Sequence, residues 1–321
     1  MIHLLPTILL LIAGLALILF GANYMTDGSA AIARRLNVSG FVIGLTIVAL
    51  GTSMPEMVVS VISALKGEGD IAIGNVVGSN SFNALVILGI CALFRPISLT
   101  SLNVYRDIPL GIGASLVLAL CAWSGAITRI EGVILLLLYI GMIIYTIFNA
   151  KPSVEEQELE KEMEQSEPMN MWLASLLTAG GMGALIYGGT LFIDNAVLVA
   201  EYFHIPSNVI AITLVAGGTS LPEFAASLVS LIKGKSDIAL GNVIGSNIAN
   251  ILLVLGFSST LTPLTMGGIT MVDIWVVVLS SALLFLTAFT LGKNKIDRSE
   301  GAIMVVLFGL YIAYMIKSSL I

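Results

Sequence analysis

The sequence carries two copies of one long segment, and this repeat restricts the possible folds more than any other feature. Shifting the chain by 167 residues, the difference between Glu223 and Glu56, aligns residues 40–89 with residues 207–256 without a gap. GTSMPE then lies over GTSLPE, and GNVVGSN lies over GNVIGSN. The same shift pairs Gly14 with Gly181, so the duplication includes the segment before each motif. Any fold must therefore contain the same structural unit twice.

Composition places both copies in a membrane. The chain is 57% hydrophobic and only 11% charged, with a mean hydropathy of +1.03, which excludes an ordinary soluble domain. A membrane-spanning helix needs about 20 mostly apolar residues. Apolar runs of that size predict ten spans, five in each half: about 4–33, 41–65, 71–94, 105–124, 128–149, 170–200, 207–232, 238–261, 271–291 and 299–317.

An odd number of spans in each copy turns the second copy upside down in the membrane. We therefore expect an all-α polytopic membrane protein of ten transmembrane helices, built as two inverted five-helix repeats. The first repeat covers residues 1–150, an acidic linker covers 151–169, and the second repeat covers 170–321. Helices 2, 3, 7 and 8 carry the repeated motifs, and we expect them to be broken at the core of the fold.

The basic residues predict the orientation of the chain, because positively charged loops stay in the cytoplasm. With ten spans, one face receives eleven of them and the other face receives three, Lys66, Arg129 and Lys317. Both termini should then lie outside the cell and the acidic linker inside. The eleven are Arg34, Arg35, Arg95, Arg106, Lys151, Lys161, Lys233, Lys235, Lys293, Lys295 and Arg298.

Charge and cysteine content exclude several other classes of protein. The net charge is −6, but seven glutamates fall between Glu155 and Glu167, so the acidity belongs mainly to the linker. Nothing in the sequence indicates binding of nucleic acid. The two cysteines, Cys91 and Cys121, lie in apolar runs and predict packing rather than a disulfide.

Glu56 and Glu223 lie near the middle of their apolar spans. A carboxylate at that depth costs several kcal/mol unless it is paired, neutralised or faces a cavity. No lysine or arginine lies near the middle of a span to serve as a fixed counter-charge, so each glutamate needs a cation or a proton. Pro55 and Pro222 precede them, lack an N–H group and crowd the preceding turn, which predicts a kink and freed carbonyl oxygens.

Oxygen-bearing side chains accompany each glutamate at helical spacing. Ala49, Thr52, Ser53 and Glu56 share one helix face, and Ala216, Thr219, Ser220 and Glu223 repeat the pattern. In the following span Ser79 and Asn83 are neighbours, as are Ser246 and Asn250. These are ligands for hard cations such as Ca²⁺, and the sequence has no histidine or cysteine cluster for zinc or copper. One Ca²⁺ or several Na⁺ would balance the two carboxylates, and their competition for one site would produce exchange.

Both motif pairs resemble the alpha repeats of the calcium:cation antiporter superfamily, and the whole chain looks like a prokaryotic sodium/calcium exchanger. The resemblance implies that Ca²⁺ is bound by Glu56 and Glu223 with the carbonyl groups of Thr52 and Thr219. It implies Asn83 and Asn250 as lining of a middle site. It also implies Na⁺ positions formed by Ala49, Thr52, Ser53, Ser79, Ala216, Thr219, Ser220, Ser246, Glu56 and Glu223.

The resemblance implies a secondary active antiporter of Na⁺ and Ca²⁺ that works as a monomer in the lipid bilayer, without a cofactor. One departure is that some relatives have aspartate at the position of Asn250, which disfavours potassium co-transport here. A Ca²⁺/H⁺ antiporter uses the same two glutamates and is the main alternative. A passive channel fits inverted repeats poorly. Residues 67–70 match the GxGD of intramembrane aspartyl proteases, but Asp70 is explained more simply as a helix N-cap, and we expect no enzyme.

Overall fold

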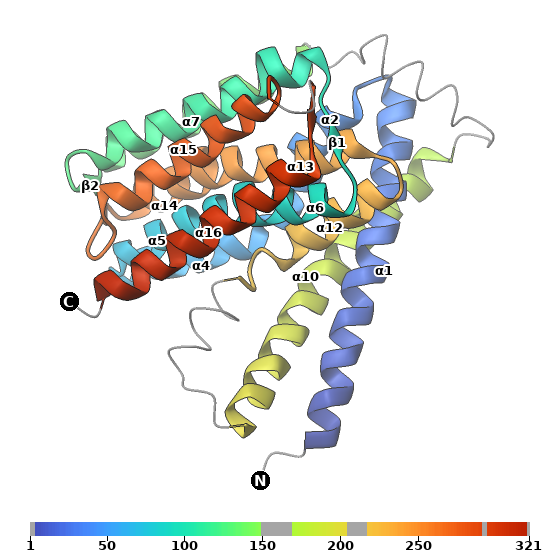
Figure 1. Cartoon of the computed structure of the whole chain (residues 1–321), viewed down its shortest axis with the longest axis horizontal. Helices are drawn as coiled ribbons and strands as arrows, with labels where there is room; N and C mark the ends of the chain where they lie inside the picture. The colour runs from blue at the N-terminus through green and yellow to red at the C-terminus, as the bar shows by residue number, and fades with distance from the viewer. Residues whose placement is uncertain (1–3, 149–168, 204–216, 291–293, 320–321) are drawn as a thin grey trace. The chain divides into compact units, whose positions relative to one another are not determined.

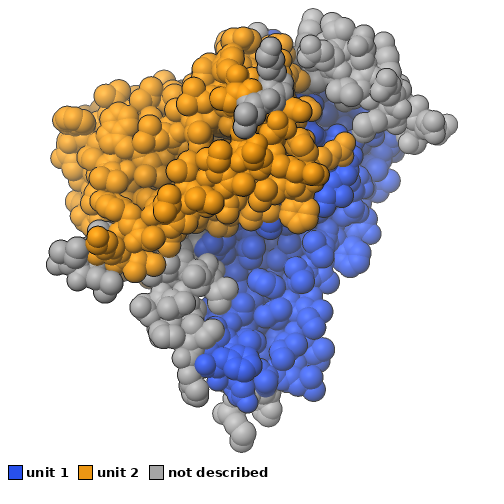
Figure 2. All heavy atoms as spheres, viewed as in Figure 1, with its two compact units in different colours: residues 1–58, 147–242 blue, residues 59–146, 243–321 orange. Residues whose placement is uncertain are grey.

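The computed structural model describes residues 4–148, 169–203, 217–290 and 294–319. The chain divides into two compact units, coloured separately in Figure 2. Unit 1 consists of residues 1–58 and 147–242, and unit 2 of residues 59–146 and 243–321. Each unit therefore takes residues from both copies of the repeat. Almost all of the predicted linker lies outside the described residues, as does the first part of the predicted span 207–232.

The described chain is almost entirely helical (Figure 1). Four of the predicted spans contain a π-helical turn, either between two α-helices or at the start of one. In chain order the segments are α1 (Leu4–Leu36), α2 (Gly40–Ile43), η1 (Gly44–Val48), α3 (Ala49–Thr52), α4 (Met54–Lys66), α5 (Gly69–Phe82), η2 (Asn83–Ile87), α6 (Leu88–Phe94), η3 (Asn103–Asp107), α7 (Ile108–Ala122), α8 (Arg129–Phe148), α10 (Met171–Tyr202), α12 (Leu221–Ile232), α13 (Ser236–Ala249), η5 (Asn250–Leu255), α14 (Gly256–Leu261), α15 (Met271–Thr287) and α16 (Arg298–Ser319).

Each of the ten predicted spans coincides with one of these helical stretches. Within the described residues, seven helical segments are long and apolar enough to cross a membrane, and the bent pair 40–52 and 54–66 makes an eighth. The remaining two, α12 and α15, are shorter apolar helices. Residues 204–216 are not described, so the full length of the span that contains α12 is not defined.

Large apolar side chains are exposed along several helices, as a lipid-facing surface requires. Leu5 and Phe20 on α1, Leu137 and Phe148 on α8, and Leu310 on α16 are between 61% and 83% exposed. In water such surfaces would favour aggregation, whereas in a bilayer they contact acyl chains. The interior of unit 1, by contrast, is packed with alanines and branched aliphatic residues around Met25.

In unit 1, α1 and α10 lie side by side (Figure 1) and pack through glycines. A Cβ atom on Gly14 would lie 2.9 Å from the carbonyl oxygen of Gly188, and one on Gly21 would lie 2.7 Å from that of Gly181. Residue numbers rise along α1 as they fall along α10, so the two helices are antiparallel. Because α10 is the repeat copy of α1, the predicted inversion is present within this unit.

In unit 2, α7 packs on α15 and α6 packs on α16. Short antiparallel strand pairs join the ends of these helices. The strand β1 (Ile97–Ser98) pairs with β4 (Lys295–Ile296), and β2 (Ala126–Ile127) pairs with β3 (Leu264–Thr265). These strands were not predicted from the sequence, but they contain two residues each and leave the all-α class unchanged.

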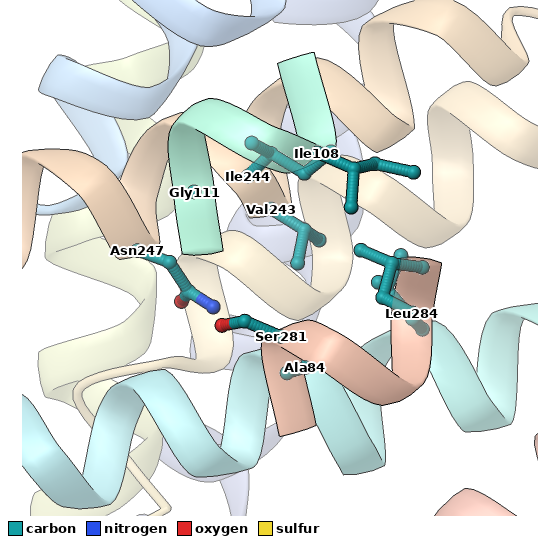
Figure 3. A pocket seen from close by; sticks show the side chains of 9 residues that line it. Ala84, Ile108, Gly111, Val243, Ile244, Asn247, Ser281 and Leu284 are labelled. Carbon is teal, nitrogen blue, oxygen red and sulfur yellow. The ribbon is translucent and has the colours of Figure 1, made fainter. Parts of the chain in front are cut away.

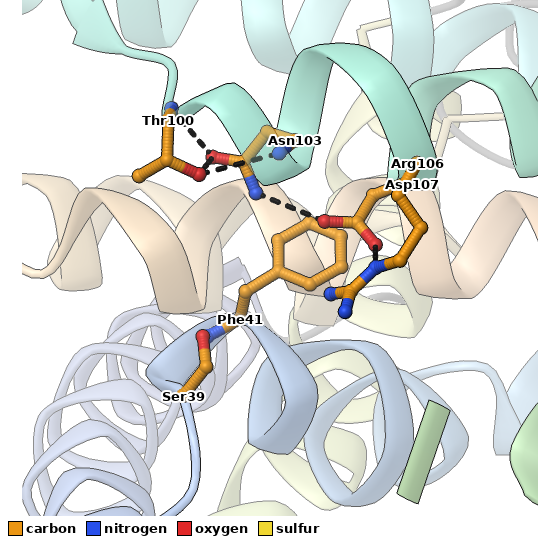
Figure 4. A network of polar contacts seen from close by, with 6 residues as sticks. All are labelled: Ser39, Phe41, Thr100, Asn103, Arg106 and Asp107. Carbon is orange, nitrogen blue, oxygen red and sulfur yellow. Dashed lines mark hydrogen bonds and ion pairs between the residues drawn. The ribbon is translucent and has the colours of Figure 1, made fainter. Parts of the chain in front are cut away.

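A network of hydrogen bonds stabilises the π turn η3, directly before α7 (Figure 4). The backbone N and the hydroxyl group of Thr100 donate to Asn103 Oδ1 at 2.9 and 2.8 Å. Asn103 Nδ2 donates to Asp107 Oδ2 at 3.2 Å, and Arg106 Nε donates to Asp107 Oδ1 at 2.7 Å. The buried carboxylate of Asp107 is thereby neutralised by its neighbour, so this acidic group serves the helix start.

Candidate cation site

The first motif lies where a helix is interrupted. Ser39 caps α2 by accepting a hydrogen bond from the backbone N of Phe41 at 3.2 Å (Figure 4), and the helical chain continues to Thr52. Ser53 then leaves the helical conformation, with φ −81° and ψ 8°, and α4 starts one residue later. The two helical parts are bent by 48°. The break predicted from Pro55, which cannot donate a backbone hydrogen bond, is confirmed.

The second motif has the same local backbone. Ser220, the equivalent of Ser53, has φ −89° and ψ 8°, and α12 begins immediately after it with Pro222 in its first turn. The near-identical angles indicate that the shared sequence Gly-Thr-Ser-x-Pro determines the break. Ala216, a predicted sodium ligand, lies outside the described residues, and Thr219 is half-buried.

The two glutamates and two serines form a crossed pair within unit 1, which we term the glutamate cluster (Ser53, Glu56, Ser220 and Glu223). The hydroxyl group of Ser53 donates to Glu223 Oε1 at 3.2 Å, and that of Ser220 donates to Glu56 Oε1 at 3.3 Å. Both glutamates are fully buried. Each carboxylate therefore accepts a hydrogen bond from the opposite repeat, and the two carboxylates interact electrostatically.

Among the described residues, no basic side chain forms an ion pair with Glu223, and its Oε2 has no hydrogen-bond partner. Two buried carboxylates this close repel each other in a low dielectric unless cations or protons neutralise them. The geometry therefore calls for a positively charged ligand.

Asn242 supports this cluster and was not predicted from the sequence. Its Oδ1 accepts a hydrogen bond from the Thr52 hydroxyl group at 3.1 Å. Its Nδ2 donates to the backbone oxygen of Glu223 at 3.2 Å and to Ser227 Oγ at 2.9 Å. One amide thereby connects both motifs, because it holds Thr52 from the first and Glu223 from the second.

The repeat contained a signal for this residue. Asn242 is the second letter of GNVIGSN, and the same shift assigns Asn75 as its counterpart. In unit 2, Asn75 Nδ2 donates to Ser60 Oγ at 3.0 Å, which reproduces the bond from Asn242 to Ser227. A polar residue retained in both copies inside an apolar helix would have marked this pair.

Ala49 is fully buried in unit 1, and the other remaining predicted ligands are buried in unit 2. Ser79 and Ser246 are 2% and 0% exposed, and Asn83 and Asn250 are both 0% exposed. The two asparagines are the first residues of η2 and η5, so each copy widens its helix into a π turn at the same position. The sequence did not decide whether Gly74 and the other motif glycines open the backbone for ligand binding or allow close helix packing. In the structure, α5 and α13 continue through these glycines without a break.

The donor atoms are oxygens throughout. The described residues contain no group of three or more histidine, cysteine, aspartate or glutamate side chains. Two carboxylates with surrounding hydroxyl, amide and carbonyl oxygens suit Na⁺ and Ca²⁺ and do not suit soft metals.

Comparison with known proteins agrees with this chemistry. The family model described as "Sodium/calcium exchanger protein" matches residues 6–148 and 173–317, one match for each repeat. The chain belongs to this family. It is accordingly a multi-pass membrane protein that exchanges Ca²⁺ and another cation, and it is a transporter, not an enzyme. The resemblance inferred from the two motif pairs is confirmed.

Relatives match over nearly the full length. The putative antiporter CaxA of Alkalimonas amylolytica is 37% identical, covering 98% of this chain and all of the relative. The sodium/calcium exchanger MaX1 of Methanosarcina acetivorans is 31% identical, covering 96% and 97%. The structure of the sodium–calcium exchanger NCX_Mj soaked with Na⁺ and Ca²⁺ matches with a TM-score of 0.84 at 32% identity, covering 98% and 99%. This match confirms the ten-helix fold.

The acidic residues outside the cluster have separate roles. In unit 1, Lys233 Nζ lies 2.7 Å from Asp27 Oδ1, whereas the repeat counterpart Asp194 is exposed on α10. The two aspartates are therefore not equivalent. The N-cap predicted for Asp70 is wrong, because α5 begins at Gly69 with Glu68 as its cap and Asp70 lies in the first turn.

Proposed function

We propose that this family member exchanges Na⁺ for Ca²⁺ by alternating access, and that both ions compete for one site containing Glu56 and Glu223. The observation that carries the proposal is the glutamate cluster, where two fully buried carboxylates are bridged by serines of the opposite repeat. One Ca²⁺ neutralises both carboxylates, and so do two Na⁺. Both cations cannot occupy the cluster together, since like charges at such distances repel strongly.

The ligands that we propose follow from the resemblance. Thr52 and Thr219 contribute carbonyl oxygens to Ca²⁺, with Glu56 and Glu223. Asn83 and Asn250 line a middle site. The proposed sodium ligands are Ala49, Thr52, Ser53, Ser79, Ala216, Thr219, Ser220 and Ser246, beside the two glutamates.

Sodium is favoured over a proton as the driving ion by the hydroxyl groups. A proton needs only a carboxylate oxygen, whereas Na⁺ needs several oxygen ligands around it. The hydroxyl groups of Ser53 and Ser220 lie directly on the carboxylates, at 3.2 and 3.3 Å, and their oxygen atoms are available to a cation in the cluster. The Na⁺ exchange that MaX1 and NCX_Mj carry in their names points the same way.

We further propose that both termini face outward and that the linker at residues 151–169 is cytoplasmic, because eleven of fourteen basic residues then lie on the inner side. A reporter domain fused after Ile321 should be accessible only from outside the cell. A cytoplasmic reporter would contradict this orientation.

The driving ion is tested by calcium uptake into proteoliposomes. Vesicles loaded with Na⁺ and diluted into Na⁺-free medium should accumulate radioactive calcium, and vesicles carrying only a pH gradient should not. Uptake driven by the pH gradient alone would contradict the sodium proposal and favour a Ca²⁺/H⁺ antiporter. Liposomes holding the Glu56→Gln variant provide the baseline for passive leakage.

A further inference from the structure

Four buried asparagines of unit 2, which we term the asparagine cluster, form two repeat-related pairs. Asn80 on α5 corresponds to Asn247 on α13, and Asn83 at the start of η2 corresponds to Asn250 at the start of η5. Three of the four are fully buried, and Asn247 is 9% exposed. Neither Asn80 nor Asn247 belongs to the predicted ligand set.

One part of the asparagine cluster follows the repeat symmetry. Asn80 Nδ2 donates to the backbone oxygen of Asn247 at 3.0 Å, and Asn247 Nδ2 donates to the backbone oxygen of Asn80 at 3.3 Å. This reciprocal pair joins α5 to α13. Because each copy makes the same bond to the other, it remains satisfied if the two repeats exchange roles.

The other part breaks the symmetry. Asn250 Nδ2 donates to Asn80 Oδ1 at 3.0 Å. The equivalent bond would run from Asn83 Nδ2 to Asn247 Oδ1, and it is absent: both atoms are buried without a hydrogen-bond partner among the described residues. Buried amide groups are rarely left without hydrogen bonds, because an unpaired buried donor or acceptor has lost its water without replacement. The unpartnered acceptor, Asn247 Oδ1, and the unpartnered donor, Asn83 Nδ2, therefore indicate a hydrogen bond that does not form in this conformation.

The surroundings also differ between the two copies. The π turn that begins at Asn250 covers six residues, whereas the one that begins at Asn83 covers five. In addition, a small cavity borders the amide of Asn247, with Ser281 across from it (Figure 3). Free space therefore adjoins the residue whose amide oxygen has no hydrogen-bond partner among the described residues.

We propose that Asn80 and Asn247 are positioning residues that alternate in holding the two middle-site asparagines. In the conformation described, Asn80 holds Asn250 and leaves Asn83 unheld. In the conformation that opens to the opposite side of the membrane, Asn247 holds Asn83 and Asn250 is released. The inference rests on the proposed calcium antiport and on the inverted repeat, in which exchanging the conformations of the two halves exchanges the open side.

The proposal predicts opposite effects for two repeat-related substitutions. Asn80→Ala removes the bond that exists only in the described conformation, and Asn247→Ala removes the one that exists only in the other. Each variant also loses one of the two reciprocal hydrogen bonds between Asn80 and Asn247. Because this loss is the same in both variants, it does not favour either conformation. A single hydrogen bond corresponds to a population shift of about fivefold.

The test is calcium-for-calcium exchange in right-side-out and inverted membrane vesicles, because this exchange needs no driving ion. The quantity compared is the ratio of the apparent KM for Ca²⁺ on the two faces. Asn80→Ala should change this ratio about fivefold in one direction and Asn247→Ala about fivefold in the other. The double variant should return close to the wild-type ratio. The milder Asn80→Gln and Asn247→Gln pair serves the same comparison if an alanine variant does not fold.

The outcomes separate this inference from the proposed function. Wild-type protein that exchanges no calcium would overturn the calcium antiport itself. Exchange that persists while both variants shift the KM ratio in the same direction, or leave it unchanged, would overturn the alternation of Asn80 and Asn247 only. Loss of packing alone would reduce the rate or the amount of folded protein without opposite shifts.

Discussion

The glutamate cluster of unit 1 and the asparagine cluster of unit 2 are built from the same repeat but use it differently. In the glutamate cluster each serine donates to the carboxylate of the other repeat, at 3.2 and 3.3 Å, so the two copies contribute equally. In the asparagine cluster Asn250 is held by Asn80, but Asn83 is not held by Asn247. The glutamate cluster keeps the symmetry of the sequence, whereas the asparagine cluster keeps it only in the reciprocal bonds of Asn80 and Asn247.

The difference separates two tasks of an alternating-access transporter. The groups that neutralise the cation must serve it equally from either side, and equal contributions from both copies meet that need. The groups that distinguish one open conformation from the other must differ within any single conformation. Substitutions in repeat-related pairs should therefore give equal effects in the first region and opposite effects in the second.

The largest effect is expected from the carboxylates. Glu56→Gln and Glu223→Gln should each reduce calcium exchange at least a hundredfold, because the neutral amide removes half of the charge that balances Ca²⁺. Initial rates of calcium uptake into Na⁺-loaded vesicles measure this. Both proteins should fold, since glutamine relieves the buried charge. Asp194→Asn, an exposed carboxylate on the α10 surface, is the control and should transport like wild type. A tenfold difference between the two glutamine variants would break the symmetry of the cluster.

A smaller and equally matched effect is expected from the serines. Ser53→Ala and Ser220→Ala each remove a hydrogen bond to a charged group, which typically contributes about 1.5–3 kcal/mol. The apparent KM for Na⁺ should rise at least tenfold in both, and by similar factors. Transport kinetics as a function of Na⁺ concentration give the answer. An unchanged KM in either variant would show that its hydroxyl group does not serve the cation.

Asn242 should matter less than the residues on the carboxylates. Asn242→Ala removes the shorter of the two hydrogen bonds of the Thr52 hydroxyl group and leaves only the 3.4 Å contact to the backbone oxygen of Ala49. The KM for Ca²⁺ should therefore rise about fivefold. Asn195→Ala is a matched control, because Asn195 is also a buried amide of unit 1 but donates to Leu191 within its own helix. Both variants should lose stability in thermal unfolding, and only Asn242→Ala should change the KM. If Asn242→Ala and Asn195→Ala changed the KM for Ca²⁺ equally, Asn242 would contribute only to packing.

The smallest effect is expected at the partly exposed ion pair of Asp27 and Lys233. Such pairs contribute about 0–1 kcal/mol, so Asp27→Asn should lower Tm by only a few degrees, and less at high salt. Asp194→Asn should leave Tm unchanged. A large loss of transport in Asp27→Asn with Tm unchanged would indicate that the pair acts in the transport cycle.

The fold was largely predictable from the sequence because its determinants are local. Apolar runs define the spans, the odd number of spans in each copy defines the inversion, and Pro55 and Pro222 define the breaks. The π turns at Asn83 and Asn250 were not predicted, since hydropathy is insensitive to a change in backbone hydrogen-bond register.

The glutamates of the site were also predictable, because a buried carboxylate is conspicuous in an apolar helix. The roles of Asn80, Asn242 and Asn247 were not. Their partners are far away in the sequence, and the neutral amide of asparagine gives no signal of which distant group it will contact. The unequal roles of Asp27 and Asp194 likewise depend on tertiary contacts that the alignment treats as identical.

Equilibrium binding of radioactive calcium to the purified protein tests the central claim most directly. The wild-type chain should bind one Ca²⁺, Na⁺ should displace it competitively, and both Glu56→Gln and Glu223→Gln should abolish binding. Retention of wild-type calcium binding by either variant, or bound calcium that Na⁺ does not displace, would contradict a single shared site formed by the two glutamates.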